Sequence, residues 1–335
     1  MINQTSSLEF SHFPVMLNEI LKISSPSKGG TFVDCTFGGG GYSKRLLEFS
    51  KINLQAFDRD RTALLIANKL KKKFPQRFKF YHTKFSQLDN ITNNVDAFIF
   101  DLGLSSIQLN DLERGFSFRS QKKLNMTMGL NEFSALEAIN NLSEKNLKSV
   151  IKILGEEKEA YKIAKNIVKQ RNIKKILNTK DLVEIIVKSK KKQYLSKIDP
   201  CTKTFQALRI FVNKEITELI NGIINASKRL KPGGRILVVS FHSIEDRIVK
   251  YFFTNFSKNR SRSSRYFPDN ENSKLALFND YKNKVLRPSK KELKKNNRSR
   301  SAKLRYAIRS KNKFEYPKDF IKRFKRYLDL EAINV

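Results

Sequence analysis

The sequence has few of the residues that build metal sites or disulfide frameworks. Its cysteines are Cys35 and Cys201, and its histidines are His12, His82 and His242. This small, scattered set excludes a Cys/His zinc cluster and a disulfide-stapled fold, and we expect no metal. No apolar run approaches the ~20 residues that span a bilayer, and no secretory leader pattern is visible. We expect a reduced, soluble, cytoplasmic protein without a membrane partner.

Acidic residues are scarce relative to basic ones. The 335 residues include 67 Lys and Arg against 32 Asp and Glu, a net charge of +35. So positive a chain attracts polyanions, and a nucleic acid or an anionic membrane is the expected partner class. The alternative is a lysine-rich composition spread evenly over the surface. With 39% hydrophobic residues, 26 of them Phe, the chain has enough apolar material for a packed core.

The first third of the chain alternates between strand and helix patterns. A glycine-rich turn follows the first strand, and an amphipathic helix at residues 61–73 follows the second. This alternation is typical of an α/β fold, a parallel sheet with helices on both faces. The expected strands are residues 31–36, 53–58, 78–82, 95–101 and, much later, 235–241.

The strand pattern stops after Gln108. Residues 111–198 have helical periodicity and no convincing strand, which predicts an inserted helical domain. The expected parts are a first core segment at 1–110, the insertion at 111–200, and a second core segment with a basic C-terminal RNA-binding region at 201–335.

The α/β pattern resumes after the insertion. Ser243 is the expected N-cap of the last helix in this stretch, with Asp246 at its third position. The elements expected here are one long helix at 204–230, a turn at 231–234, the strand already named, and a helix at 243–253.

Four of the 13 glycines are consecutive, at residues 38–41, between a strand and a helix. Glycine there permits positive φ and lets a ligand approach the backbone at a helix N-terminus. Asp58 ends the next strand twenty residues after Gly38, where a carboxylate can accept both ribose hydroxyls of an adenosine. The dinucleotide fingerprint fails because Ser43 stands where Gly or Ala is required. S-adenosylmethionine suits an open turn beside a strand-end acid such as Asp34 better than a dinucleotide does.

Asp101 ends the fourth expected strand and is followed by Leu-Gly-Leu-Ser-Ser106. The carboxyl ends of parallel strands face the ligand crevice, so we expect Asp101 beside the reactive part of a cofactor. Its carboxylate could accept a hydrogen bond from a weakly nucleophilic aromatic amine and help to remove the proton. Alternatively, it only caps a turn or binds the cofactor.

Nine blocks, in order, make the chain similar to the bacterial 16S rRNA cytosine-N(4)-methyltransferase family over nearly its whole length. They are His12-Phe-Pro-Val-Met-Leu, Asp34-Cys-Thr-Phe-Gly-Gly-Gly-Gly, Asp58-Arg-Asp, Asp101-Leu-Gly-Leu-Ser-Ser, Glu113-Arg-Gly-Phe-Ser-Phe, Gly155-Glu-Glu, Phe205-Gln-Ala-Leu-Arg-Ile-Phe-Val-Asn, Ser240-Phe-His-Ser-Ile-Glu-Asp-Arg and Asn297-Arg-Ser-Arg-Ser-Ala-Lys-Leu-Arg.

The resemblance implies a class I methyltransferase fold, a Rossmann-like sheet interrupted by a helical domain. It implies S-adenosylmethionine as methyl donor, and the exocyclic amine of a cytosine in the decoding (P-site) region of 16S rRNA, in the small ribosomal subunit, as acceptor. The family's cofactor positions fall on Gly40, Gly41, Tyr42, Asp58, Phe85, Asp101 and Gln108, with the Phe85 ring against adenine. The sequence departs from the family at Tyr42, at Asn125-Met-Thr-Met and at Asp199-Pro.

The basic C-terminal region mixes arginines with aromatic residues, a composition suited to looped or single-stranded RNA. Cys201 has no expected activating partner, which disfavours covalent attack on the base. His242 is expected to be structural, with a role in proton transfer or RNA contact as the alternative. The expected RNA contacts are Arg298, Arg300, Lys303, Arg305 and Tyr306, then Arg260, Arg262, Arg265, Tyr266 and Phe267, and more weakly residues 188–192.

Three other functions remain open at this point. A nicotinamide-dependent oxidoreductase would share the turn and the acid. A noncatalytic RNA-binding protein would share the basic region, and an amine methyltransferase acting on DNA or protein would differ only in its acceptor.

Overall fold

The computed structural model describes residues 14–88, 93–131, 133–190, 199–258, 276–279 and 281–333. Six strands form one sheet in the order β3-β2-β1-β4-β5-β6, parallel except for the last pair. The strands are β1 (Gly30–Asp34), β2 (Ile52–Asp58), β3 (Phe78–His82), β4 (Val95–Asp101), β5 (Leu230–Ser240) and β6 (Lys303–Ile308).

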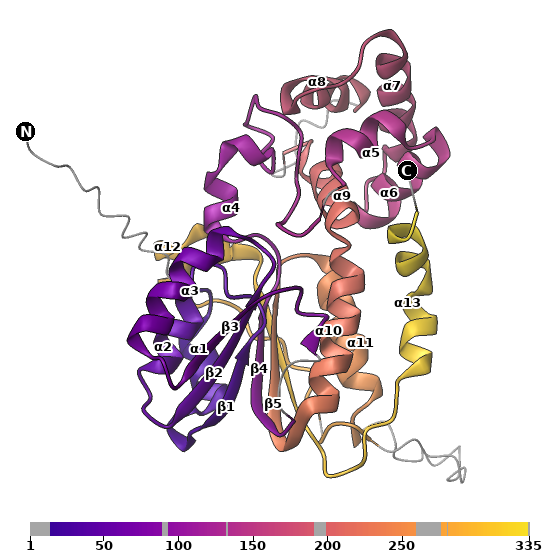
Figure 1. The fold of residues 1–335 in the computed structure, drawn as a ribbon. Coiled ribbons are helices and arrows are strands. Elements are labelled where there is room, and N and C mark those ends of the chain that lie inside the picture. Colours follow the sequence, from indigo (N-terminus) through magenta and orange to yellow (C-terminus); the bar gives the residue numbers. More distant parts are fainter. Residues whose placement is uncertain are drawn as a thin grey trace, which may run out of the picture.

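Alternate residues of the strands feed two apolar cores, one on each face of the sheet. In β4, Ala97 and Ile99 join the core under one helical layer, while Phe98 and Phe100 join the other. The first layer comprises α1 (Leu17–Ser24), α2 (Gly41–Leu47) and α3 (Thr62–Lys73), and the second comprises α10 (Glu215–Arg229), α11 (Ser243–Asn255) and α13 (Lys318–Glu331) (Figure 1). The α/β expectation is confirmed.

A helical region lies above the carboxyl ends of the strands (Figure 1). Among the described residues between Asp111 and Lys190 there are helices and no strand, as the periodicity predicts. Its helices are α5 (Ala135–Asn141), α6 (Glu144–Leu154), α7 (Ala160–Ile173), α8 (Thr179–Ser189) and α9 (Thr202–Asn213). The short elements are η1 (Pro26–Lys28), α4 (Ser106–Asn110), η3 (Leu112–Arg114), α12 (Lys290–Lys295) and η5 (Asn297–Ser301).

The single long helix expected at 204–230 is wrong. It is two helices, α9 and α10, because Lys214 adopts left-handed backbone angles with φ of 50°. Residues on other elements hold this break. The Glu331 carboxylate of α13 accepts the N–H groups of Ile216 at 3.0 Å and Thr217 at 2.8 Å, and so caps the start of α10.

Two further local expectations need correction. His242, not Ser243, is the N-cap of α11, and Glu245, not Asp246, completes the capping box. The expected turn at 231–234 lies within β5, where the pairing with β4 jumps from Leu230 to Arg235. These four residues therefore form an irregularity in the strand, and the expected strand at 235–241 is its regular part.

Candidate active site

The four glycines form a turn between β1 and α2 at the carboxyl edge of the sheet. Gly38 and Gly40 have φ of 49° and 71°, which side-chain-bearing residues rarely adopt. The Gly38 N–H donates to Asp58 Oδ2 at 2.7 Å, and the Asp60 N–H donates to Asp58 Oδ1 at 2.8 Å. Asp58 therefore shapes the turn, and both its oxygens keep lone pairs for a further donor.

The next residues differ in what they face. A Cβ on Gly40 would lie 2.9 Å from the Phe37 ring, and one on Gly41 would lie 2.5 Å from Pro14, so packing alone requires glycine at both. Nothing lies within 4 Å of a Cβ built on Gly39, so this residue is open. Tyr42 is buried, and its hydroxyl donates to the Val15 carbonyl. The phenol of Tyr42 thus has a structural partner.

Asp34 is turned away from any ligand, contrary to expectation. Its carboxylate is fully buried and accepts the Ser43 hydroxyl at 2.7 Å and the Thr36 N–H at 3.2 Å. Burial raises the pKa of Asp34 to about 6, against these hydrogen bonds. It holds α2 onto the end of β1.

Asp101 ends β4 beside this turn. Burial, followed by the nearby carboxylates of Asp34 and Glu245, raises its pKa to about 8. Its Oδ1 has no hydrogen-bond partner among the described residues, and neither does Glu218 Oε2. Buried oxygens of this kind are uncommon without a ligand or water to satisfy them.

Asp101 and Glu218 line a cavity of about 860 Å³. It brings together six of the seven sequence-predicted positions, namely Gly41, Tyr42, Asp58, Phe85, Asp101 and Gln108. Gly40 packs against Phe37 and Ile66 instead. The Phe85 ring sits edge-on to Phe100 at 5.5 Å between centroids. The volume lies within the usual range for small-molecule sites.

Gln108 has a local structural role at the edge of the cavity. Its Oε1 accepts the Ser105 N–H at 2.9 Å, and Ser105 accepts in return from the Gln108 N–H, a capping box at the start of α4. Its Nε2 donates to Asp60 Oδ2 at 2.7 Å, and Asp60 also pairs with Arg114 at 2.6 Å. Ser105 is thus the N-cap of α4.

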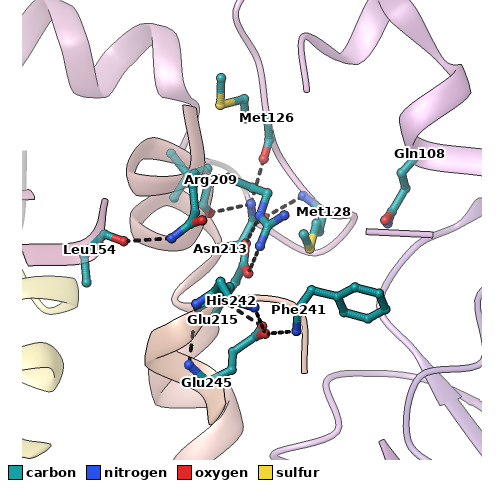
Figure 2. A network of polar contacts seen from close by, with 12 residues as sticks. Gln108, Met126, Met128, Leu154, Arg209, Asn213, Glu215, Phe241, His242 and Glu245 are labelled. Atoms are coloured by element: carbon teal, nitrogen blue, oxygen red, sulfur yellow. Dashed lines mark hydrogen bonds and ion pairs between the residues drawn. The ribbon is translucent and has the colours of Figure 1, made fainter. Parts of the chain in front are cut away.

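Charged residues of α9, α10 and α11 also line the cavity, although no local sequence pattern indicates a role for them there. Arg209 of α9 donates to both oxygens of Glu215 of α10, each at 2.8 Å, across the helix break (Figure 2). Burial would lower the pKa of Arg209, but Glu215 holds it above its usual value. Arg209 belongs to the Phe205-to-Asn213 block, so the sequence indicates this residue. The sequence does not indicate that Arg209 pairs with Glu215.

Glu245 lies next to this pair on α11 (Figure 2). Its Oε2 accepts the N–H groups of Phe241 at 2.9 Å and His242 at 3.3 Å. Burial would raise the pKa of Glu245, but His242 and the Phe241 N–H hold it below its usual value. His242 Nε2 lies 3.1 Å from Glu245 Oε1, so the expected structural role of His242 has a concrete form.

Glu215, His242 and Glu245 offer ligand atoms within 4.8 Å of one another, a spacing that could hold a metal ion. Glu215 pairs with Arg209, and Glu245 accepts the N–H groups of Phe241 and His242. His242 Nε2 lies 3.1 Å from Glu245 Oε1 but makes no hydrogen bond among the described residues.

Asn213 joins the helix break to the segment where the sequence departs from the pattern of the family that it resembles. Its Nδ2 donates to the carbonyls of Met126 at 2.7 Å and Arg209 at 2.9 Å, and its Oδ1 accepts the Met128 N–H at 2.7 Å (Figure 2). Asn125 accepts the Thr127 N–H within its own turn. One buried amide therefore fixes the departing segment.

Part of the expected RNA-binding cluster is structural. Arg305 is 5% exposed, and its Nε donates to Asp246 Oδ1 at 2.6 Å. Lys303 lies 3.0 Å from Oδ2 of the same carboxylate. The expectation that Arg305 contacts RNA is wrong, because β6 is the antiparallel edge strand and this ion pair ties it to α11. Arg298 and Arg300 remain exposed.

The structure also places the lysine run at 188–192, the Asp199-Pro departure and Cys201. Lys190 pairs with Glu157 at 2.6 Å, and Asp199 accepts the Cys201 N–H. Burial raises the pKa of Cys201 to about 12, consistent with an unactivated thiol. Several residues lie outside the described part of the chain: His12, Lys191, Lys192, Arg260, Arg262, Arg265, Tyr266 and Phe267.

Across the described residues, none of the helices combines the length and apolarity that crossing a membrane requires.

Comparison with known proteins gives long matches. The chain is 44% identical over 303 residues to "Ribosomal RNA small subunit methyltransferase H" of Bartonella bacilliformis, covering 89% of this chain and 90% of that protein. It is 42% identical to the protein of the same name from Rickettsia akari, covering 89% and 98%. A Clostridium thermocellum putative rRNA methylase structure covers 90% of this chain and 99% of that one at 12% identity, but its TM-score of 0.40 supports no conclusion. The model of the MraW methylase family matches residues 9–310, and the chain therefore belongs to that family.

Proposed function

We propose that this protein transfers a methyl group from S-adenosylmethionine to the exocyclic N(4) amine of a cytosine in the decoding (P-site) region of 16S rRNA. Family membership and the names of the relatives support a small-subunit rRNA methyltransferase. The sequence resemblance supplies the cytosine and the decoding region. A cytoplasmic location follows from this substrate.

The single observation that carries the proposal is the acidic wall of the cavity in a strongly basic chain. Five carboxyl groups line it, those of Asp58, Asp101, Glu215, Glu218 and Glu245. Two of their buried oxygens lack a partner among the described residues. A ligand with cationic groups and N–H or O–H donors satisfies these buried carboxyl groups.

S-adenosylmethionine fits this requirement, because it carries a sulfonium and an ammonium group and no phosphate. When bound, it supplies an electrophilic methyl group with a good leaving group. In our proposal Asp58 accepts ribose hydroxyls with its remaining lone pairs, and Phe85 lies against the adenine. The backbone at Gly41 and Tyr42 contacts the methionine part, and Gln108 holds the edge of the site through Asp60.

Asp101 is the proposed catalytic residue. With a pKa of about 8, Asp101 is protonated in the ligand-free cavity at pH 7. A cation bound nearby would lower this pKa and favour the ionised carboxylate. The ionised Oδ1 can then accept a hydrogen bond from the cytosine amine and take up the proton that the amine loses when the methyl group passes from the donor sulfur, whose bond to carbon breaks, to nitrogen. Positioning of the two reactants supplies much of the remaining acceleration.

The test is transfer of labelled methyl to small-subunit RNA, followed by mass mapping of the methylated nucleotide. We expect one N(4)-methylated cytosine in 16S rRNA, present with the protein and missing without it. Methyl on a cytosine carbon or on another base would contradict the amine chemistry. RNA binding without any transfer would favour the noncatalytic alternative, and transfer to DNA or protein alone would reassign the acceptor.

A further inference from the structure

One face of α3 forms part of the cavity. Ile66, Lys69, Leu70 and Lys73 line it, a spacing of three, four and seven residues that places them on one side of a helix. Lys69 and Lys73 are exposed, one turn apart, about 6 Å along the axis. The remaining lysines of this helix, Lys71 and Lys72, do not line the cavity, although they too are exposed.

Two other exposed cations complete a rim around this part of the cavity. They are Lys44 of α2 and Arg298 of η5, and we call the set of Lys44, Lys69, Lys73 and Arg298 the basic rim. Within the described part of the chain none of the four pairs with a carboxylate; Arg298 donates to the amide oxygen of Asn110 at 2.9 Å. By contrast, Arg45, next to Lys44, is neutralised by Glu48 at 2.8 Å.

The rim and the interior differ in both exposure and charge. All five carboxyl-bearing residues that line the cavity are buried or half-buried, and the four rim cations are exposed. Apolar residues also line the cavity, among them Pro14, Phe37 and Leu70, which are buried, and Ile66, which is half-buried. A polyanion approaching this cavity therefore meets attraction at the rim and repulsion further in.

We propose that the basic rim binds the phosphates of the single-stranded RNA segment that carries the target base. This rests on the proposed function. The rim fixes the sugar-phosphate backbone while the acidic interior excludes it, so that only an uncharged base, taken out of its stack, enters the cavity. On this proposal α3, and not β6, carries the main RNA contacts of the sheet domain.

The experiment compares two double variants of the full-length protein. Lys69→Gln with Lys73→Gln removes two rim charges, while Lys71→Gln with Lys72→Gln removes two charges from the same helix outside the cavity. The measurements are affinity for a small-subunit RNA fragment as a function of salt, and donor affinity by calorimetry.

We expect the rim variant to lose about tenfold in RNA affinity at low salt, with the slope of log affinity against log salt falling by about 1.4, the value for two single-strand phosphate contacts. The control variant should change neither quantity by more than a small fraction of this. Donor affinity should stay the same in both.

Two outcomes would overturn the rim proposal, and a third would overturn only the proposed function. Equal losses in the two variants would mean that the lysines contribute only general charge. Reduced donor affinity in the rim variant would mean that Lys69 and Lys73 bind the cofactor instead. If the rim variant loses RNA affinity but the unmodified protein transfers no methyl group, the rim stands and the proposed function fails.

Discussion

The cavity wall and the outer surface of this molecule differ in charge sign and in how their charges are used. The chain as a whole carries +35, yet the buried groups that line the cavity are mainly carboxyls, with Arg59 and Arg209 engaged by Asn213 and Glu215. Net charge therefore describes how a partner approaches, and the cavity describes what chemistry follows. The difference between the two regions has an exception, because Arg305 belongs to the basic C-terminal segment and is nevertheless buried.

The largest effect is expected from removal of the acidic side chain of Asp101, which lines the cavity. Asp101→Asn keeps the shape of the side chain and removes its ability to accept a proton. We expect methyl transfer to fall about 1,000-fold, within the range for acid–base groups. Single-turnover kinetics at saturating donor and RNA would measure it. A variant with nearly normal turnover would confine Asp101 to a binding or turn-capping role.

The next effect separates buried from exposed cations. Arg305→Met leaves Asp246 with only Lys303, and we expect the free energy of unfolding to fall by about 3 kcal/mol. Arg300→Met, at an exposed position of the same segment, serves as control and should change it by under about 0.5 kcal/mol. Urea unfolding of both variants provides the measurement. Equal stability of the two would show that the Asp246 pairing contributes nothing.

A smaller effect concerns the acid at the glycine turn. Asp58→Ala removes the acceptor for the Gly38 and Asp60 N–H groups and the proposed ribose contact. We expect donor affinity to weaken by about 2 kcal/mol. Calorimetric titration with donor tests this, with circular dichroism as the check on folding. Unchanged affinity would remove Asp58 from the ribose role.

The smallest effect is a pH dependence of donor binding. With a pKa of about 8 in the ligand-free cavity, Asp101 carries a proton at pH 7, and a cationic donor favours the ionised form. Affinity should therefore rise about tenfold between pH 7 and 9 and then level off, with proton release on binding near pH 7. Calorimetry in buffers of different ionisation enthalpy measures this release. It should vanish in Asp101→Asn; its persistence there would assign the proton to another group.

Local patterns predicted the strands that carry the site. The strand ends at Asp58 and Asp101, the positive-φ turn at Gly38 and the helical insertion follow from periodicity and glycine placement. Contacts between distant segments did not follow from pattern. The break at Lys214 is stabilised by Glu331 and Asn213, which contact residues distant in the sequence. Asp34 has the position of a ligand-binding acid in the sequence, but in the structure it accepts a hydrogen bond from Ser43.

Strand β6 shows why charge hides structure in a sequence. All its residues are buried or half-buried, but Lys303 and Arg305 make the segment resemble a solvated tail. The acid that pairs with Arg305 is Asp246, which lies 59 residues earlier, in a segment whose pattern predicts the start of a helix. A basic run is structural or functional depending on a partner that local sequence does not reveal.

The last residue of β2 and the two residues after it contact three separate parts of the molecule. Asp58 holds the glycine turn, Arg59 donates to the Asn213 carbonyl at the α9/α10 break, and Asp60 holds Gln108 and Arg114. This tripeptide therefore links the glycine turn to the α9/α10 break and to the residues that open the helical region. A nucleoside bound to Asp58 would lie one and two residues from the contacts that tie these parts together.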